Sequence, residues 1–102
     1  MQFHCNSEIV GDAVVVTPFG EVDRDTAPEL RHALEKAVLE AGTGSVEVDL
    51  RHVTFMDSSG IGALLAGHRL AGTTGATLRA RNPAPSVHRV LDVTNVWPLL
   101  RE

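Results

Sequence analysis

Hydrophobic and polar residues follow two different periods along this chain. Short runs rich in β-branched residues predict strands at residues 8–10, 13–17, 46–50, 53–55 and 76–80. The third run alternates apolar residues with Glu47 and Asp49, so we expect one face on the core and both carboxylates on the other. Residues 11–12 suit a tight turn between the first two strands, and Pro18 and Gly20 should end the second strand.

A spacing of three and four between apolar residues predicts a helix after the second strand. Thr26 is placed to cap it, and Glu29 follows three residues later, as in a capping box. Pro28 falls in the first turn, where its missing N–H costs no hydrogen bond. Gly42 and Gly44 should end the helix. Its predicted buried face consists of Leu30, Leu34, Ala37, Val38 and Ala41.

A second helix is predicted to begin at residues 57–60 and to end at Gly72 and Gly75. The face that we assign to the core carries the larger side chains, Ile61, Leu64, Leu65, His68 and Ala71. The opposite face carries mainly small residues, Gly60, Ala63, Ala66, Gly67 and Leu70.

An ordinary surface helix is charged on the side away from the core, but between Gly60 and Gly72 only His68 and Arg69 are polar. A helix that is apolar nearly all round is either buried on both sides or presents a surface to a partner. We interpret Gly60, Ala63 and Gly67 as a flat docking face for a partner. Tight packing within the domain is the alternative interpretation.

The rest of the chain predicts a turn at residues 82–85 and a third helix from about Ser86, whereas the segment from Val93 onward follows no clear period. Strands alternate with helices throughout, without repeats or linkers. The pattern therefore predicts one α/β domain over residues 1–102, with a small mixed β-sheet and helices packed against it.

Composition narrows the classes of function. The chain has 102 residues, of which 43% are hydrophobic and 22% are charged, which is ordinary for one folded domain. The net charge of −4 argues against a nucleic-acid partner. Cys5 is the sole cysteine, so an internal disulfide is impossible. Because no apolar run has the length of a membrane span or a signal peptide, we expect no membrane partner and a cytoplasmic location.

Residues 57–62, Asp-Ser-Ser-Gly-Ile-Gly, carry the strongest chemical signal, because they lie where a strand gives way to a helix. Asp57 and the serines are preferred helix caps. The free N–H groups at a helix start also favour an anion, so the fold would tolerate a phosphate on a serine there. The spacing alone leaves open a purely structural role as a cap.

Catalytic motifs are missing from the sequence. Neither Ser58 nor Ser59 follows a glycine at the spacing of a hydrolase nucleophile elbow. The single lysine, Lys36, belongs to no phosphate-binding loop, and the five histidines lack the spacing of metal ligands. We therefore predict a protein that is not an enzyme, without a metal site or cofactor.

Two segments, FGEVDRDTAPEL at residues 19–30 and VDLRHVTFMDSSGIG at residues 48–62, resemble the STAS domain family. The resemblance is to its bacterial anti-sigma factor antagonists of sporulation and stress signalling, and it extends over nearly the whole chain. It implies a STAS fold and a binding switch without catalysis. The family usually runs on through a longer C-terminal helix, which we expect to be short or absent after residues 97–100, Trp-Pro-Leu-Leu.

The resemblance implies that Ser58 is the phosphorylation site. The kinase would be an anti-sigma factor with serine kinase activity, which the unphosphorylated form binds so that a sigma factor is released. A serine phosphatase would reset the switch. The residues that match the family's partner-binding loop and docking helix are Asp23, Asp57, Ser59, Gly60, Ala63 and Gly67. The alternative is a STAS scaffold that is never phosphorylated, or an accessory subunit of a transporter or a stress-signalling assembly.

Overall fold

A computed structural model describes residues 2–101; Met1 and Glu102, the two ends of the predicted domain, lie outside the described residues. Strands and helices alternate as the sequence predicts. In chain order they are β1 (His4–Val10), β2 (Ala13–Val22), α1 (Ala27–Ala41), β3 (Ser45–Asp49), β4 (Val53–Met56), α2 (Ser58–Thr74), β5 (Thr77–Arg81), α3 (Pro85–Val93) and α4 (Trp97–Leu100).

The strands form one mixed five-stranded sheet, which confirms the predicted α/β class. The order is β1-β2-β3-β5, with β4 beside the far half of β2. Strand β1 is antiparallel to β2, and the other pairs are parallel. Strand β2 therefore holds the sheet together, because its first half pairs with β3 and its second half with β4.

Strand β2 continues to Val22, so the prediction that Pro18 and Gly20 end it is wrong. On the β3 side, the pairing of β2 stops at Val16, and pairing with β4 begins only at Gly20. Pro18 lies between these two pairings, at a position where β2 has no parallel partner strand. Its missing N–H therefore removes no hydrogen bond from either pairing. On the other side β2 pairs with all of β1, which is correspondingly longer than the predicted residues 8–10.

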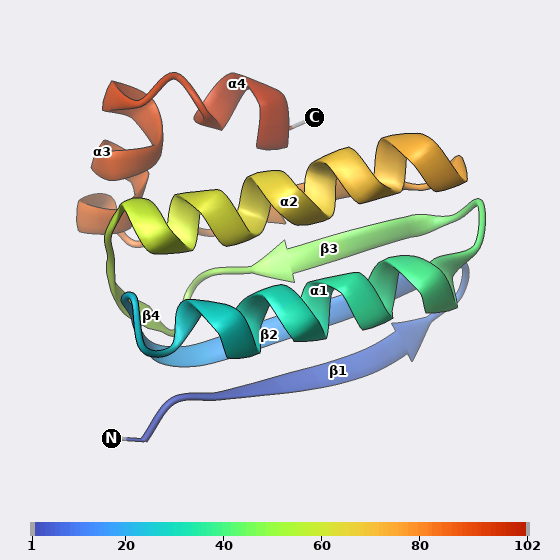
Figure 1. Cartoon of the computed structure of the whole chain (residues 1–102), viewed down its shortest axis with the longest axis horizontal. Coiled ribbons are helices and arrows are strands. Elements are labelled where there is room, and N and C mark those ends of the chain that lie inside the picture. The colour runs from blue at the N-terminus through green and yellow to red at the C-terminus, as the bar shows by residue number, and fades with distance from the viewer. Residues whose placement is uncertain (1, 102) are drawn as a thin grey trace.

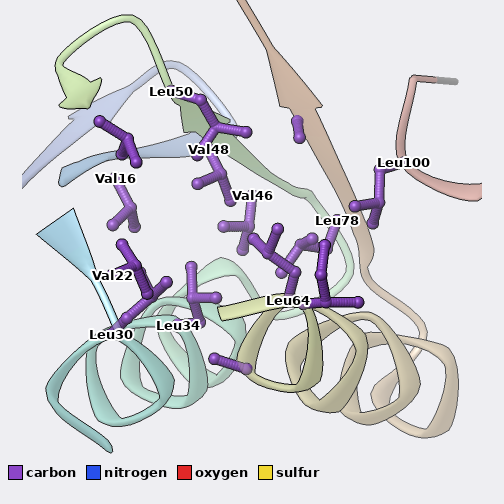
Figure 2. Close-up of a cluster of buried hydrophobic side chains, with 14 of the residues drawn as sticks. Val16, Val22, Leu30, Leu34, Val46, Val48, Leu50, Leu64, Leu78 and Leu100 are labelled. Atoms are coloured by element: carbon purple, nitrogen blue, oxygen red, sulfur yellow. The ribbon is translucent and has the colours of Figure 1, made fainter. Parts of the chain in front are cut away.

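Helices α1 and α2 lie side by side on one face of the sheet (Figure 1), while α3 packs against β4 and α4 against β5. The core fills the layer between that face and the two helices, as Figure 2 shows for Val16, Leu34, Val46, Leu64 and Leu78. The unassigned C-terminal segment forms α4, whose Leu100 is fully buried beside the same core. None of the helices in residues 2–101 has both the length and the hydrophobicity that a membrane crossing requires.

Asp49 does not point to solvent as the alternation predicts; it is only 7% exposed. Its carboxylate pairs with the Arg51 guanidinium at 3.1 Å and accepts hydrogen bonds from the Arg51 N–H at 3.1 Å and the Asn82 amide at 3.4 Å. Burial by itself would raise the pKa of Asp49, but these hydrogen bonds and the charge of Arg51 outweigh it and lower the pKa. The carboxylate thus ties the end of β3 to the residue after β5.

The predicted docking face of α2 is wrong in its orientation, because Gly60, Ala63 and Gly67 are buried. A Cβ added at Gly60 would lie 2.6 Å from Met56 Cγ, and one added at Gly67 would lie 2.9 Å from Leu78 Cδ1. The small residues let the α2 backbone lie close against α1 and the sheet. The open side of α2 instead carries Gly62 and Arg69.

We predict that Gly67→Leu destabilises the fold by about 1–3 kcal/mol or more, because the new side chain must enter a packed layer beside Leu34 and Leu78. Gly72→Leu is the matched control, since a Cβ at Gly72 meets nothing within 4 Å. Replacing that helical glycine should leave stability unchanged or raise it by up to ~1 kcal/mol. Urea denaturation of both variants measures the difference; equal midpoints would show that Gly67 does not face packed core.

Candidate functional site

The loop between β4 and α2 is held in place by hydrogen bonds at both of its ends. Asp57 is the N-cap of α2, and its carboxylate accepts a hydrogen bond from the Ser59 N–H at 2.8 Å. The Asp57 N–H donates to the Val22 carbonyl at 3.2 Å, which ties the loop to the end of β2. Ser58, the first residue of the helix, is exposed, whereas Ser59 is half-buried.

The loop between β2 and α1 is organised by the Asp23 carboxylate. It accepts hydrogen bonds from the N–H groups of Asp25 at 2.9 Å and Thr26 at 3.1 Å. The Thr26 hydroxyl accepts from the Asp23 N–H at 2.9 Å and donates to the Glu21 carbonyl at 2.8 Å. The predicted capping box with Glu29 is wrong, because the Thr26 side chain is used by its own loop and makes no cap bond to the helix.

Parallel pairing of β2 with β4 brings these two loops together, since Val22 lies opposite Met56 at the end of both strands. The loops enclose an open cleft of about 390 Å³ that is lined by Asp23, Arg24, Asp25, Asp57 and Ser59. Three of the predicted partner-binding residues, Asp23, Asp57 and Ser59, are thus neighbours in space although they come from distant parts of the sequence.

A second shallow cleft adjoins the first between the starts of α1 and α2. Its walls are Arg24, Ala27, Pro28, Arg31, Ser59, Gly62 and Ala63. Ala63 lines it at only 4% exposure, while the predicted residues Gly60 and Gly67 line neither cleft. Gly60 is buried against Met56 and Val22, and Gly67 against Leu34 and Leu78. A partner therefore cannot contact these two glycines, which affect binding only by setting the position of α2.

Sequence reasoning missed Arg24, Arg31 and Gly62. Arg24 lies between two aspartates and lines both clefts, and Arg31 pairs with Glu35 at 3.2 Å. Gly62 faces open space, because a Cβ there would meet nothing within 4 Å. The sequence indicated Gly62 only by its position as the second glycine after the serines. A helix that is apolar nearly all round does not show which of its glycines faces outward.

Charges of both signs line the same cleft. Asp23, Asp25 and Asp57 supply negative charge, and Arg24 and the start of α2 supply positive charge. Within residues 2–101, no group of three or more His, Cys, Asp and Glu side chains is arranged to hold a metal ion. The arrangement suits recognition of another protein at an exposed serine.

Comparison with known proteins identifies the family of this chain. A family model described as "Mlab, STAS domain" matches residues 5–101. The chain belongs to the STAS domain family. An anti-sigma F factor antagonist of Paenibacillus polymyxa is 28% identical over 87 residues, which cover 85% of this chain and 74% of that protein. The resemblance inferred from the sequence motifs is therefore confirmed.

Two solved structures share the fold over most of their length. The anti-sigma factor antagonist SpoIIAA in its unphosphorylated form superposes with a TM-score of 0.75 at 29% identity, covering 95% of this chain and 85% of that one. The Bacillus cell fate determinant SpoIIAA in its phosphorylated form gives 0.67 at 25% identity, covering 97% and 88%. This STAS domain therefore resembles a protein that exists in both phosphorylation states.

We predict that Asp57→Ala lowers the free energy of unfolding by about 0.5–2 kcal/mol, because the Ser59 N–H loses its cap. Asp57→Asn keeps an acceptor oxygen at the same place and should retain most of the stability. Thermal unfolding of both variants checks this. Equal losses in the two would show that the charge of Asp57, not its hydrogen bond, stabilises the helix start.

Proposed function

We propose that this STAS protein is an anti-sigma factor antagonist controlled by phosphorylation of Ser58. Its unphosphorylated form binds an anti-sigma factor and thereby releases a sigma factor for transcription. The observation that supports this most directly is an exposed serine at the start of α2, next to a cleft built from Asp23, Arg24 and Asp57. The relatives named anti-sigma factor antagonists support the choice of partner.

The partner would transfer the γ-phosphoryl group of ATP to the Ser58 hydroxyl, releasing ADP and a proton, so this chain acts as substrate and ligand and has no catalytic role. An anti-sigma factor with serine kinase activity would reach the exposed Ser58 hydroxyl without unfolding the helix. Ser59 is a poorer acceptor, because it is half-buried and its N–H is held by Asp57. A serine phosphatase would restore the binding form.

Electrostatic repulsion across the interface accounts for the release of the partner. A phosphate adds about −1.5 to −2 charges at neutral pH, beside the carboxylates of Asp57, Asp23 and Asp25. The start of α2 offsets only about 0.3–1 kcal/mol of this repulsion within the domain. An interface formed with a neutral serine must then desolvate a dianion, and like charges brought together there cost several kcal/mol. A penalty of ~2–4 kcal/mol weakens binding by roughly 30- to 1000-fold.

A STAS scaffold or accessory subunit that is never phosphorylated is the competing function. It predicts no phosphoryl transfer to this chain from any anti-sigma kinase. Phosphorylation with ATP, followed by mass spectrometry, separates the two functions and locates the phosphate.

We predict that Ser58→Ala abolishes phosphorylation by the cognate anti-sigma kinase, while Ser59→Ala is still phosphorylated. Both variants should keep the fold, since within residues 2–101 neither serine side chain hydrogen-bonds to the rest of the domain, and the Ser59 N–H that donates to Asp57 is a backbone group that alanine retains. Circular dichroism provides that control. Phosphate on Ser58→Ala but not on Ser59→Ala would place the modification site at Ser59.

We predict that Gly62→Leu weakens binding of the anti-sigma factor at least tenfold without lowering the melting temperature. Gly62 lines the cleft beside Ser59 and has free space above it, so a leucine there obstructs a partner and not the core. Gly72→Leu, at the other end of α2, is the matched control and should bind normally. Calorimetric titration gives the affinities; undiminished affinity of Gly62→Leu would place the docking surface elsewhere.

A further inference from the structure

Strand β1 forms an open edge of the sheet. Within the described chain it pairs with β2 alone, and Figure 1 shows it as the outermost strand, at the end of the sheet away from α3 and α4. The backbone N–H and C=O groups on its outer side are therefore available to another strand. Such an edge is a template for pairing with a further chain.

This edge lacks the features by which proteins usually prevent such pairing. All seven residues of β1 pair with β2 in continuous register, without a bulge. The strand contains no lysine and no proline. With its histidine neutral, Glu8 is the one charged side chain of the strand. Ile9 is 69% exposed and Val10 is 53% exposed. A long, flat and partly apolar edge of this kind favours association.

A groove runs between this edge and α1. Cys5, Ser7 and Ile9, the alternate residues that face the helix side, form its floor, with His32 and Lys36 of α1 among its other lining residues. The groove has a volume of about 430 Å³. Burial, together with the charge of Glu29, raises the pKa of Cys5 to about 11, so the thiol is neutral and contributes an apolar surface.

We infer that a second copy of this chain pairs with β1 in antiparallel orientation, about a two-fold axis at Ser7. The axis is perpendicular to the sheet, so both copies keep their helices on the same face. Cys5 then lies opposite the partner's Ile9, and Asn6 lies opposite the partner's Glu8. All seven residues of each β1 are paired, and the two sheets become one continuous sheet.

Charge and length select this register over its neighbours. A register centred on Glu8 would place two carboxylates directly opposite each other, which is destabilising. A register centred on Asn6 would pair only residues 4–8 and leave Ile9 and Val10 unpaired and exposed. The register centred on Ser7 places Glu8 against a neutral amide and covers Ile9 beside Cys5. Complementarity of the strand with itself therefore favours a second copy over an unrelated peptide.

Analytical ultracentrifugation tests the inference on the full chain. The mass of the protein should rise from the 10.9 kDa monomer toward twice that value between micromolar and millimolar concentration. Ile9→Lys, which places a charge on the edge, should raise the dimer dissociation constant at least tenfold. Val93→Lys is the matched control, because Val93 is 72% exposed on α3 and should leave dimerisation unchanged. A monomer at millimolar concentration, or equal effects of the two lysines, would overturn the inference.

Disulfide trapping tests the register. In a Cys5→Ala background, Ser7→Cys places two thiols across the axis with Cα atoms about 4.5–5.5 Å apart, within the range of a disulfide. Asn6→Cys in the same background sets its two Cα atoms about 7–8 Å apart on a diagonal, too far for an unstrained bridge. Oxidation should trap the Ser7→Cys dimer and not the Asn6→Cys dimer. Trapping of neither, or of both equally, would contradict the register. None of these residues lines the clefts at Ser59, so the outcome is independent of the proposed switch.

Discussion

The close approach of α2 to α1 and the sheet is the contact on which the rest of this structure depends. It is possible because Gly60, Ala63 and Gly67 place little or no side chain between the helix and its neighbours. At Gly60 even a methyl group would meet Met56 and Val22, which belong to the two strands that precede the functional loops. The helix start that carries Ser58 is therefore fixed relative to both loops by packing as well as by hydrogen bonds.

This rigidity would allow the proposed switch to work without a change of fold. The Asp57 N–H donates to the Val22 carbonyl at the end of β2, and the Asp57 carboxylate caps α2. Because the loop is restrained at both ends, it does not pass a movement on to the rest of the domain. A phosphate added at the exposed Ser58 changes the charge of the surface and leaves the core contacts behind it intact. The affinity for the partner would then fall through charge repulsion and desolvation, which act over the few ångströms of an interface.

The sequence predicted the elements well and their faces less well. The alternation of apolar residues and the positions of the glycines located α1, α2, α3 and most strands, and the motif at residues 57–62 located the loop, because these are local signals. The orientation of α2 was not predictable, since a helix without a polar face has no period that distinguishes inside from outside. The continuation of β2 past Pro18 and the burial of Asp49 depend on β4 and Asn82, which are distant in sequence.

The most direct test of this account compares the protein with and without phosphoserine incorporated at position 58, by amide NMR and hydrogen exchange. The account predicts chemical-shift changes confined to residues 57–62 and the neighbouring loop at residues 23–26, with unchanged exchange protection in β3 and β5. Shifts spread across the sheet, or lost protection in β3 and β5, would contradict it and show that phosphorylation acts by rearranging the fold.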